Sequence, residues 1–251
     1  DAITGARGVV RVRASQQIGV LRALHEAVGQ LGRALAPFVP SILAAFASLL
    51  VHATHVACAA PGADAAEGAL LPAAARLTAA DGSLLGAAAA ASLPEGERLT
   101  LAQAREARLW CMKLLAALLR ALPTYDYRRW MPIVFGCAAP VLGRLATHYT
   151  QSANGLLTTL LTMVEEPATL PLLALAPAPV LPPVYATIAA RRLAPAVLDT
   201  LLAIVEALLR HARTAAPAAA PDGDGADAAA DGGDGDGDDD GVAATARSLL
   251  E

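Results

Sequence analysis

The stretch LGRALAPFVPSILAAF, residues 31–46, places two prolines inside a run of the strong helix formers Ala and Leu. A residue before proline is pushed out of the α-helical region, so a helix preceding Pro37 should end near Ala36. Proline is tolerated in a first turn, so a second helix can begin at or just after Pro40. The stretch therefore predicts the corner of a helical hairpin.

The residues on both sides of this corner have the spacing of amphipathic helices. Before it, one apolar stripe consists of Ile18, Leu21, Leu24, Val28, Leu31 and Leu35. After it, the apolar face consists of Ile42, Leu43, Phe46, Leu49 and Leu50. We expect Phe38 and Val39 to anchor the corner between the two helices.

A second strong helical pattern begins at Thr100 and runs to about Leu122. Thr100 and Gln103 have the spacing of a capping box, which predicts a helix N-terminus there. Pro123 ends this pattern, and a further helix is expected with Pro132 near its start. Shorter helices are expected over residues 152–166, 184–192 and 194–213.

Composition supports an all-α class, because Ala and Leu are abundant and aromatic residues make up only 4% of the chain. A helix pair cannot bury its apolar stripe alone and must stack on its neighbours. The sequence therefore predicts an α-solenoid of HEAT-like antiparallel helix pairs with disordered insertions.

The chain divides into six predicted segments. They are a leading segment (1–14), a HEAT-like hairpin (15–58), an Ala/Gly-rich loop or insertion (59–97), HEAT-like repeats (98–213), a disordered acidic Asp/Gly linker (214–243) and the start of a further helix (244–251). Because the chain begins at Asp1 without Met and stops within a helical pattern, we interpret it as an excerpt of a larger polypeptide.

The formal net charge of -4 conceals a basic body. Nine of the 23 acidic residues are aspartates within residues 222–240, and without them 14 acids stand against 19 bases. A basic body with an acidic appendage fits a protein that works near polyanions.

A multi-pass membrane protein is the alternative architecture. Residues 34–63 and 167–190 contain no Asp, Glu, Lys or Arg, and about 20 apolar residues suffice to cross a bilayer. Prolines interrupt both windows, and His52 and His55 lie in the first, so the soluble helical reading is favoured and no membrane partner is expected.

Two patterns suggest metal binding and neither completes a site. His52, His55 and Cys58 are spaced three apart, but one helix supplies only a partial ligand set. In the tail DGGDGDGDDDG the calcium-loop spacing fails, because the sixth position is Asp239 and the twelfth is Thr245.

The sequence also lacks the motifs of catalysis, with no nucleophile elbow, phosphate-binding loop or dinucleotide fingerprint. Cys58, Cys111 and Cys137 have no zinc-ligand spacing and are expected to be buried apolar residues. We therefore expect no enzyme, no catalytic residue, no metal, no cofactor and no small-molecule substrate.

The stretch YDYRRWMP, residues 125–132, sets two arginines among three aromatic residues. Arginine binds phosphates and aromatic rings stack on bases, although such aromatics more often pack a helix corner. Arg128 and Arg129 are the candidate contacts to RNA or protein.

Residues 103–174, from QAREARLW to ATLPLLA, resemble a C-terminal region of the U-three small nucleolar RNA-associated protein twenty family, also named "down-regulated in metastasis". The resemblance covers roughly residues 15–58 and 100–210 and rests on ordered features. They are Leu31-Gly32, the Pro37 to Pro40 corner, Arg108-Leu109, Tyr125 to Arg128, Pro140, Ser152 leading to Leu156, Leu157 and Leu160, and Pro171-Leu172-Leu173.

The resemblance implies a non-catalytic HEAT-repeat, armadillo-like helical scaffold of the nucleolar small-subunit processome. Such a scaffold binds pre-ribosomal RNA and processome proteins during 18S ribosomal RNA processing and ribosome biogenesis. Other HEAT-repeat proteins, namely nuclear transport carriers and the solenoids of TOR-type kinases, remain alternatives on the residues alone.

Overall fold

The computed structural model of the chain describes residues 13–59, 99–142, 151–176, 181–189, 193 and 195–214. These residues form helices and contain no strand, so the predicted all-α class is confirmed. The helices are α2 (Ala14–Leu31), η1 (Gly32–Phe38), α3 (Val39–Ala59), α7 (Leu101–Ala121), α8 (Met131–Leu142), α9 (Gln151–Glu165), η3 (Leu170–Leu175), α10 (Leu181–Ala189) and α11 (Pro195–Thr214), where η marks 3-10 helices. The predicted leading segment, insertion, acidic linker and further helix lie outside the described residues, apart from their border positions.

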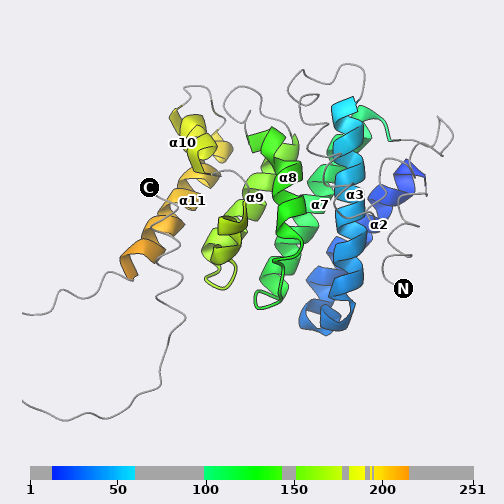
Figure 1. The fold of residues 1–251 in the computed structure, drawn as a ribbon, viewed down its shortest axis with the longest axis horizontal. Helices are drawn as coiled ribbons and strands as arrows, with labels where there is room; N and C mark the ends of the chain where they lie inside the picture. Colours follow the sequence, from blue (N-terminus) through cyan, green and yellow to red (C-terminus); the bar gives the residue numbers. More distant parts are fainter. Residues whose placement is uncertain are drawn as a thin grey trace, which may run out of the picture.

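The described helices pack side by side in a row that starts with α2 and α3 and finishes with α10 and α11 (Figure 1). Four of them form one layer, in which α2 packs on α7, α7 on α9, and α9 on α11. In the second layer, α3 packs on α7 and α8, and α10 packs on α11. Each helix of the first layer therefore buries its apolar face against the next pair along the chain, as stacked helix pairs require.

Neighbouring helices of the first layer run in the same direction. Arg22 of α2 pairs with Glu106 of α7, and three residues later the ring of His25 lies against Trp110. Farther along, the Thr159 hydroxyl of α9 donates a hydrogen bond of 2.9 Å to the carbonyl oxygen of Met112 in α7. The C-terminal ends of these helices consequently lie at one edge of the row.

The corner before α3 differs from the expectation at two positions. The α-helix ends at Leu31 and not near Ala36, because Gly32 has a φ of +51°, which breaks the α-helical path. A 3-10 helix then carries the chain to Phe38, and α3 begins at Val39. The 3-10 helix has a tighter turn of three residues, which leaves Phe38 61% exposed. Val39 is fully buried, so only Val39 anchors the corner.

The start of α7 agrees with the sequence. The backbone N–H of Thr100 donates to the side-chain oxygen of Gln103 at 2.9 Å, and the Gln103 N–H donates to the Thr100 hydroxyl at 3.3 Å. This reciprocal pair satisfies two N–H groups that the first turn leaves without partners, so the predicted capping box is confirmed.

Proline positions also account for α10. This helix begins at Leu181, three residues earlier than expected from the pattern, with Pro182 and Pro183 in its first turn. The N–H groups of a first turn have no intrahelical acceptor, so the two prolines cost no hydrogen bond there.

The core is one continuous apolar cluster that runs through the described helices. Helix α7 lies at its centre, and its Leu114, Leu115, Leu118 and Leu119 are fully buried. Helices α7 and α9 lie close together at Gly155, where an added Cβ would lie 2.9 Å from Leu109 Cδ1 and 3.1 Å from Met112 Cβ. Only glycine permits this separation without a shift of α7.

Within the part of the chain that the structure describes, one helical stretch, Ser15–Ala57, is long and apolar enough to cross a membrane by length and composition. Of its most apolar window, 67% is buried inside the protein. A mostly buried core helix passes the same test, so the stretch is weak support for the membrane alternative.

Candidate functional site

The corner between α7 and α8 carries the two arginines singled out in the sequence. Arg128 and Arg129 are both exposed, and the Arg129 guanidinium carbon lies 5.5 Å from the centre of the Trp130 ring. The Arg128 N–H donates a hydrogen bond of 3.1 Å to Asp126 Oδ1, which holds the corner in a tight turn. This hydrogen bond restrains the backbone of the corner, on which both arginine side chains are exposed.

Two tyrosines support this corner from beneath. Tyr127 is fully buried, and its hydroxyl lies 2.9 Å from the carbonyl oxygen of Leu118 and 3.1 Å from that of Leu122, at the end of α7. The Tyr125 ring packs edge-on against the Tyr127 ring at 5.1 Å. Burial raises the pKa of Tyr127 far above its ordinary value, so the phenol stays a neutral donor.

Further arginines lie at the same edge of the row. Arg33 in η1 and Arg120 in the last turn of α7 are exposed, and η1 packs against α7. We call Arg33, Arg120, Arg128 and Arg129 the corner patch. Part of its charge complements the negative ends of α2 and α7, since cations are favourable near helix C-termini.

A second cluster of charged and aromatic side chains lies between α2 and α7 and was missed in the sequence. Lys113 Nζ lies 4.5 Å and the Arg22 guanidinium carbon 5.3 Å from the centre of the half-buried Trp110 ring. The His25 ring meets the same tryptophan edge-on at 5.6 Å, and Arg22 pairs with Glu106. We call these five residues the Trp110 cluster.

The signal for the Trp110 cluster was present in the sequence. Glu106, Trp110 and Lys113 are spaced four and three apart, which places them on one side of α7. Only the packing of α2 on α7 shows that Arg22 and His25 complete the cluster. Two cations beside an aromatic ring stabilise this helix contact, and the same groups can bind phosphate and stack on bases.

His52 of the predicted partial metal pattern lies on the buried side of α3. His52 is 1% exposed, and neither of its ring nitrogens has a hydrogen-bond partner among the described residues. Burial, with the nearby His55 as a smaller cause, lowers the pKa of His52 to about 4. Among the described residues no group of three His, Cys, Asp or Glu side chains could hold a metal ion.

Two of the three cysteines are buried free thiols, as expected. Cys111 is fully buried, and burial raises its pKa far above the ordinary value, so no reactive thiolate forms. Cys137 is also buried. Beside them the sequence missed the burial of Arg108, which is 3% exposed and lines a small internal space with Leu50 and Leu156.

Comparison with known proteins assigns the family. No curated protein and no solved structure matches the chain significantly. Residues 6–234 match the family model described as "U3 small nucleolar RNA-associated protein 20, N-terminal". The predicted family is therefore confirmed, but the predicted C-terminal position within it is wrong.

The reason for this error is physical. Successive helix pairs of a long helical protein satisfy the same packing constraints, so their apolar spacing identifies the kind of protein more readily than the position along it. The chain belongs to the U3 small nucleolar RNA-associated protein 20 family, matching its N-terminal region, and this membership implies a role in ribosome biogenesis.

Proposed function

We propose that this chain is a non-catalytic part of a HEAT-like solenoid scaffold in the nucleolar small-subunit processome. In this role it binds pre-ribosomal RNA and assembly factors during maturation of 18S ribosomal RNA. The observation that carries the proposal is the family match over residues 6–234.

The packing of the helices supports a scaffold role. Helices α2, α7, α9 and α11 each pack on the next, so the row presents the ends and outer sides of several helices along its length. A surface of this kind binds large partners through many weak contacts whose effects multiply.

The corner patch supports contact with RNA. Its four arginines are exposed, and Asp126 is the acidic residue within the α7–α8 corner. A guanidinium group presents a planar set of N–H donors that matches the oxygens of a phosphate, and arginine remains charged at every physiological pH. Arg128 and Arg129 are the first residues to test, and the Trp110 cluster offers a stacking surface between α2 and α7.

The proposal is tested first in cells. The protein that carries this chain is tagged, cross-linked to RNA with ultraviolet light and purified, and the attached RNA is sequenced. We expect enrichment of the 5′ external spacer and the 18S precursor. Recovery of transport cargo or kinase partners without this RNA would overturn the proposal in favour of another class of helical-repeat protein.

A salt titration tests the corner patch directly. Each phosphate contact to single-stranded RNA contributes about 0.7 to the slope of log affinity against log salt. Replacing Arg128→Gln and Arg129→Gln together should therefore lower the slope by about 1.4. Arg213→Gln, which removes an exposed charge from the other end of the row, is the control and should leave the slope within error. Equal slopes for all three proteins would exclude Arg128 and Arg129 as RNA contacts.

A further inference from the structure

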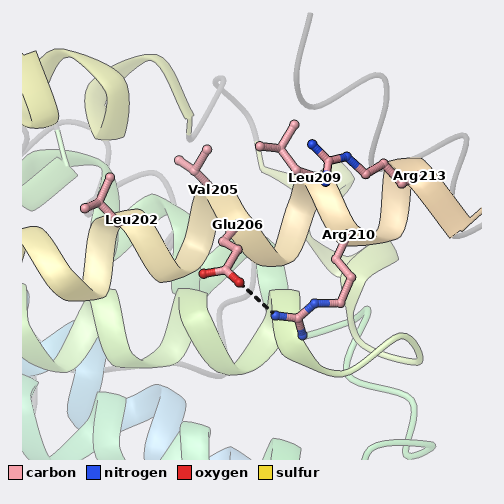
Figure 2. Close-up of a pocket in the computed structure, with 6 residues that line it drawn as sticks. All are labelled: Leu202, Val205, Glu206, Leu209, Arg210 and Arg213. Atoms are coloured by element: carbon pink, nitrogen blue, oxygen red, sulfur yellow. Dashed lines mark hydrogen bonds and ion pairs between the residues drawn. The ribbon is translucent and has the colours of Figure 1, made fainter.

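The last helix of the described row has an apolar face without a neighbour. Leu202 and Leu209 of α11 are 48% and 41% exposed, and Val205 between them is half-buried. Figure 2 shows the three side chains projecting from one side of the helix, next to the ion pair of Glu206 and Arg210. We call Leu202, Val205 and Leu209 the outer face of α11.

This face is additional to the face that α11 already buries. Val197, Leu201, Ile204 and Leu208 form a separate stripe that is at most 6% exposed and packs toward α9 and α10. A helix at the edge of a protein needs one apolar stripe, whereas α11 has two. Two stripes are characteristic of a helix with neighbours on two sides, as α7 has in α2 and α9.

We propose that residues 242–251 of the same chain form a helix that docks on the outer face of α11. Their sequence, VAATARSLLE, places Val242, Ala246, Leu249 and Leu250 at steps of four, three and one, which is one side of a helix. They contain the first leucines after α11, since residues 215–241 consist of Ala, Pro, Gly and Asp. Within residues 215–251, this is the segment with a complementary apolar stripe.

The chain already contains one arrangement of this kind. Residues 60–98, rich in Ala and Gly, separate α3 from α7, yet α3 and α7 pack directly on each other. Residues 215–241 are also rich in Ala and Gly, and they separate α11 from residues 242–251. We infer the same arrangement at α11. The helices that flank residues 215–241 pack together, and this packing covers the outer face of α11.

The length of the intervening sequence favours this occupant over a second copy of the chain. A random coil of the length of residues 215–241 has a root-mean-square span of about 30 Å. A helix of the length of α11 also measures about 30 Å, so the segment reaches every part of the outer face. Tethering of this kind gives effective concentrations on the order of millimolar, above the concentration of free copies in ordinary solutions.

The test measures how well the outer face is covered in the chain of residues 1–251. A cysteine is placed on this face by Leu209→Cys, and its labelling by a maleimide is followed by mass spectrometry, which separates it from the native cysteines. In this background Leu249→Asp and Leu250→Asp are introduced together. We expect the labelling rate at position 209 to rise about 5- to 30-fold, the range that corresponds to losing a modest docking energy.

A charge-matched control separates docking from a general effect of acidic residues. Ala244→Asp and Ser248→Asp together add the same charge on the opposite side of the proposed helix and should leave the labelling rate unchanged. Equal rates in all three proteins would overturn the proposal, and so would equal acceleration by both pairs. A labelling rate that falls with protein concentration, unaltered by Leu249→Asp and Leu250→Asp, would instead identify a second copy as the occupant. These outcomes are independent of RNA binding, which is tested by replacing Arg128 and Arg129.

Discussion

Helices α7 and α11 have similar lengths and similar proportions of Leu and Ala, but they have different surroundings. Helix α7 contacts α2 and α3 on one side and α9 on the other, and its Leu114, Leu115, Leu118 and Leu119 are fully buried. Helix α11 contacts α9 and α10, and its Leu202 and Leu209 are 48% and 41% exposed. Burial of an apolar residue in this fold therefore depends on whether the next helix is present, since both helices carry leucines on more than one side.

The largest expected effect compares a leucine in each helix. Leu115→Ala removes a fully buried side chain from the centre of α7 and should lower the free energy of unfolding by about 2–5 kcal/mol. Leu202→Ala removes a side chain that is 48% exposed and should cost less than about 1 kcal/mol. Urea unfolding followed by circular dichroism measures both, and similar losses would contradict the contrast between the two helices.

The second prediction concerns the contact that α7 makes with α9. Gly155→Ala places a methyl group 2.9 Å from Leu109 Cδ1 and 3.2 Å from the Leu109 carbonyl oxygen. The resulting overpacking should lower the free energy of unfolding by about 1–3 kcal/mol.

The matched control for this change is Gly29→Ala in α2, where nothing lies within 4 Å of the added Cβ. Alanine is the better helix former, so this variant should be neutral or more stable by up to about 1 kcal/mol. Thermal melting of the two variants checks the difference. If Gly155→Ala stabilised the protein, the distance between α7 and α9 would be larger than in this structure.

The third prediction uses the buried histidine of α3, which packs on α7. His52 has a pKa of about 4 in the folded protein, compared with 6.5 for the unfolded group. Between these values the unfolded chain binds a proton that the folded protein does not, so stability is complete above pH 6.5 and falls as the pH is lowered toward 4. At pH 5 this group should cost about 2 kcal/mol relative to pH 8.

Unfolding free energies measured from pH 8 to pH 5 test this loss. The variant His52→Leu should lack this part of the decrease, because leucine does not titrate. His25→Gln, which changes a histidine of the Trp110 cluster and keeps His52, should retain it. An identical acid dependence in all three proteins would assign the decrease to other groups.

The smallest expected effect is at the end of α7. Tyr127→Phe removes the hydroxyl near the carbonyl oxygens of Leu118 and Leu122. Both carbonyls keep a backbone donor, from Leu122 and Tyr125 respectively, so the loss should be only about 1 kcal/mol. Tyr125→Phe is the control, since its hydroxyl has no hydrogen bond to the described residues, and it should change stability by less than about 0.5 kcal/mol. Equal losses in chemical denaturation would show that the ring, and not the hydrogen bond, supports the corner.

Local sequence patterns predicted much of the fold. The capping box at Thr100 and Gln103 and the end of α9 before Pro167 follow from interactions between residues close in the chain. The corner at Gly32 was placed wrongly, because the glycine's left-handed conformation ends α2 before the prolines do. The exposure of Phe38 was missed for the same reason, since it depends on the 3-10 path between Gly32 and Val39.

The candidate site was only partly predictable. Arg128 and Arg129 were found because they are adjacent to aromatic residues in the sequence. The Trp110 cluster and the corner patch each combine residues from two helix pairs, separated by more than 80 positions along the chain. Single-sequence periodicity has no information on which helices become neighbours, so neither set could be assembled from it.

The sequence by itself determined the class, the approximate helices and the family of this protein, because helix propensity, capping and apolar spacing act within a few residues. Only the tertiary structure decided which apolar faces are covered, which charges stand together and which histidine is kept neutral. Those properties depend on contacts between distant helices, and it is these contacts that bury α7 on two sides and leave the outer face of α11 exposed.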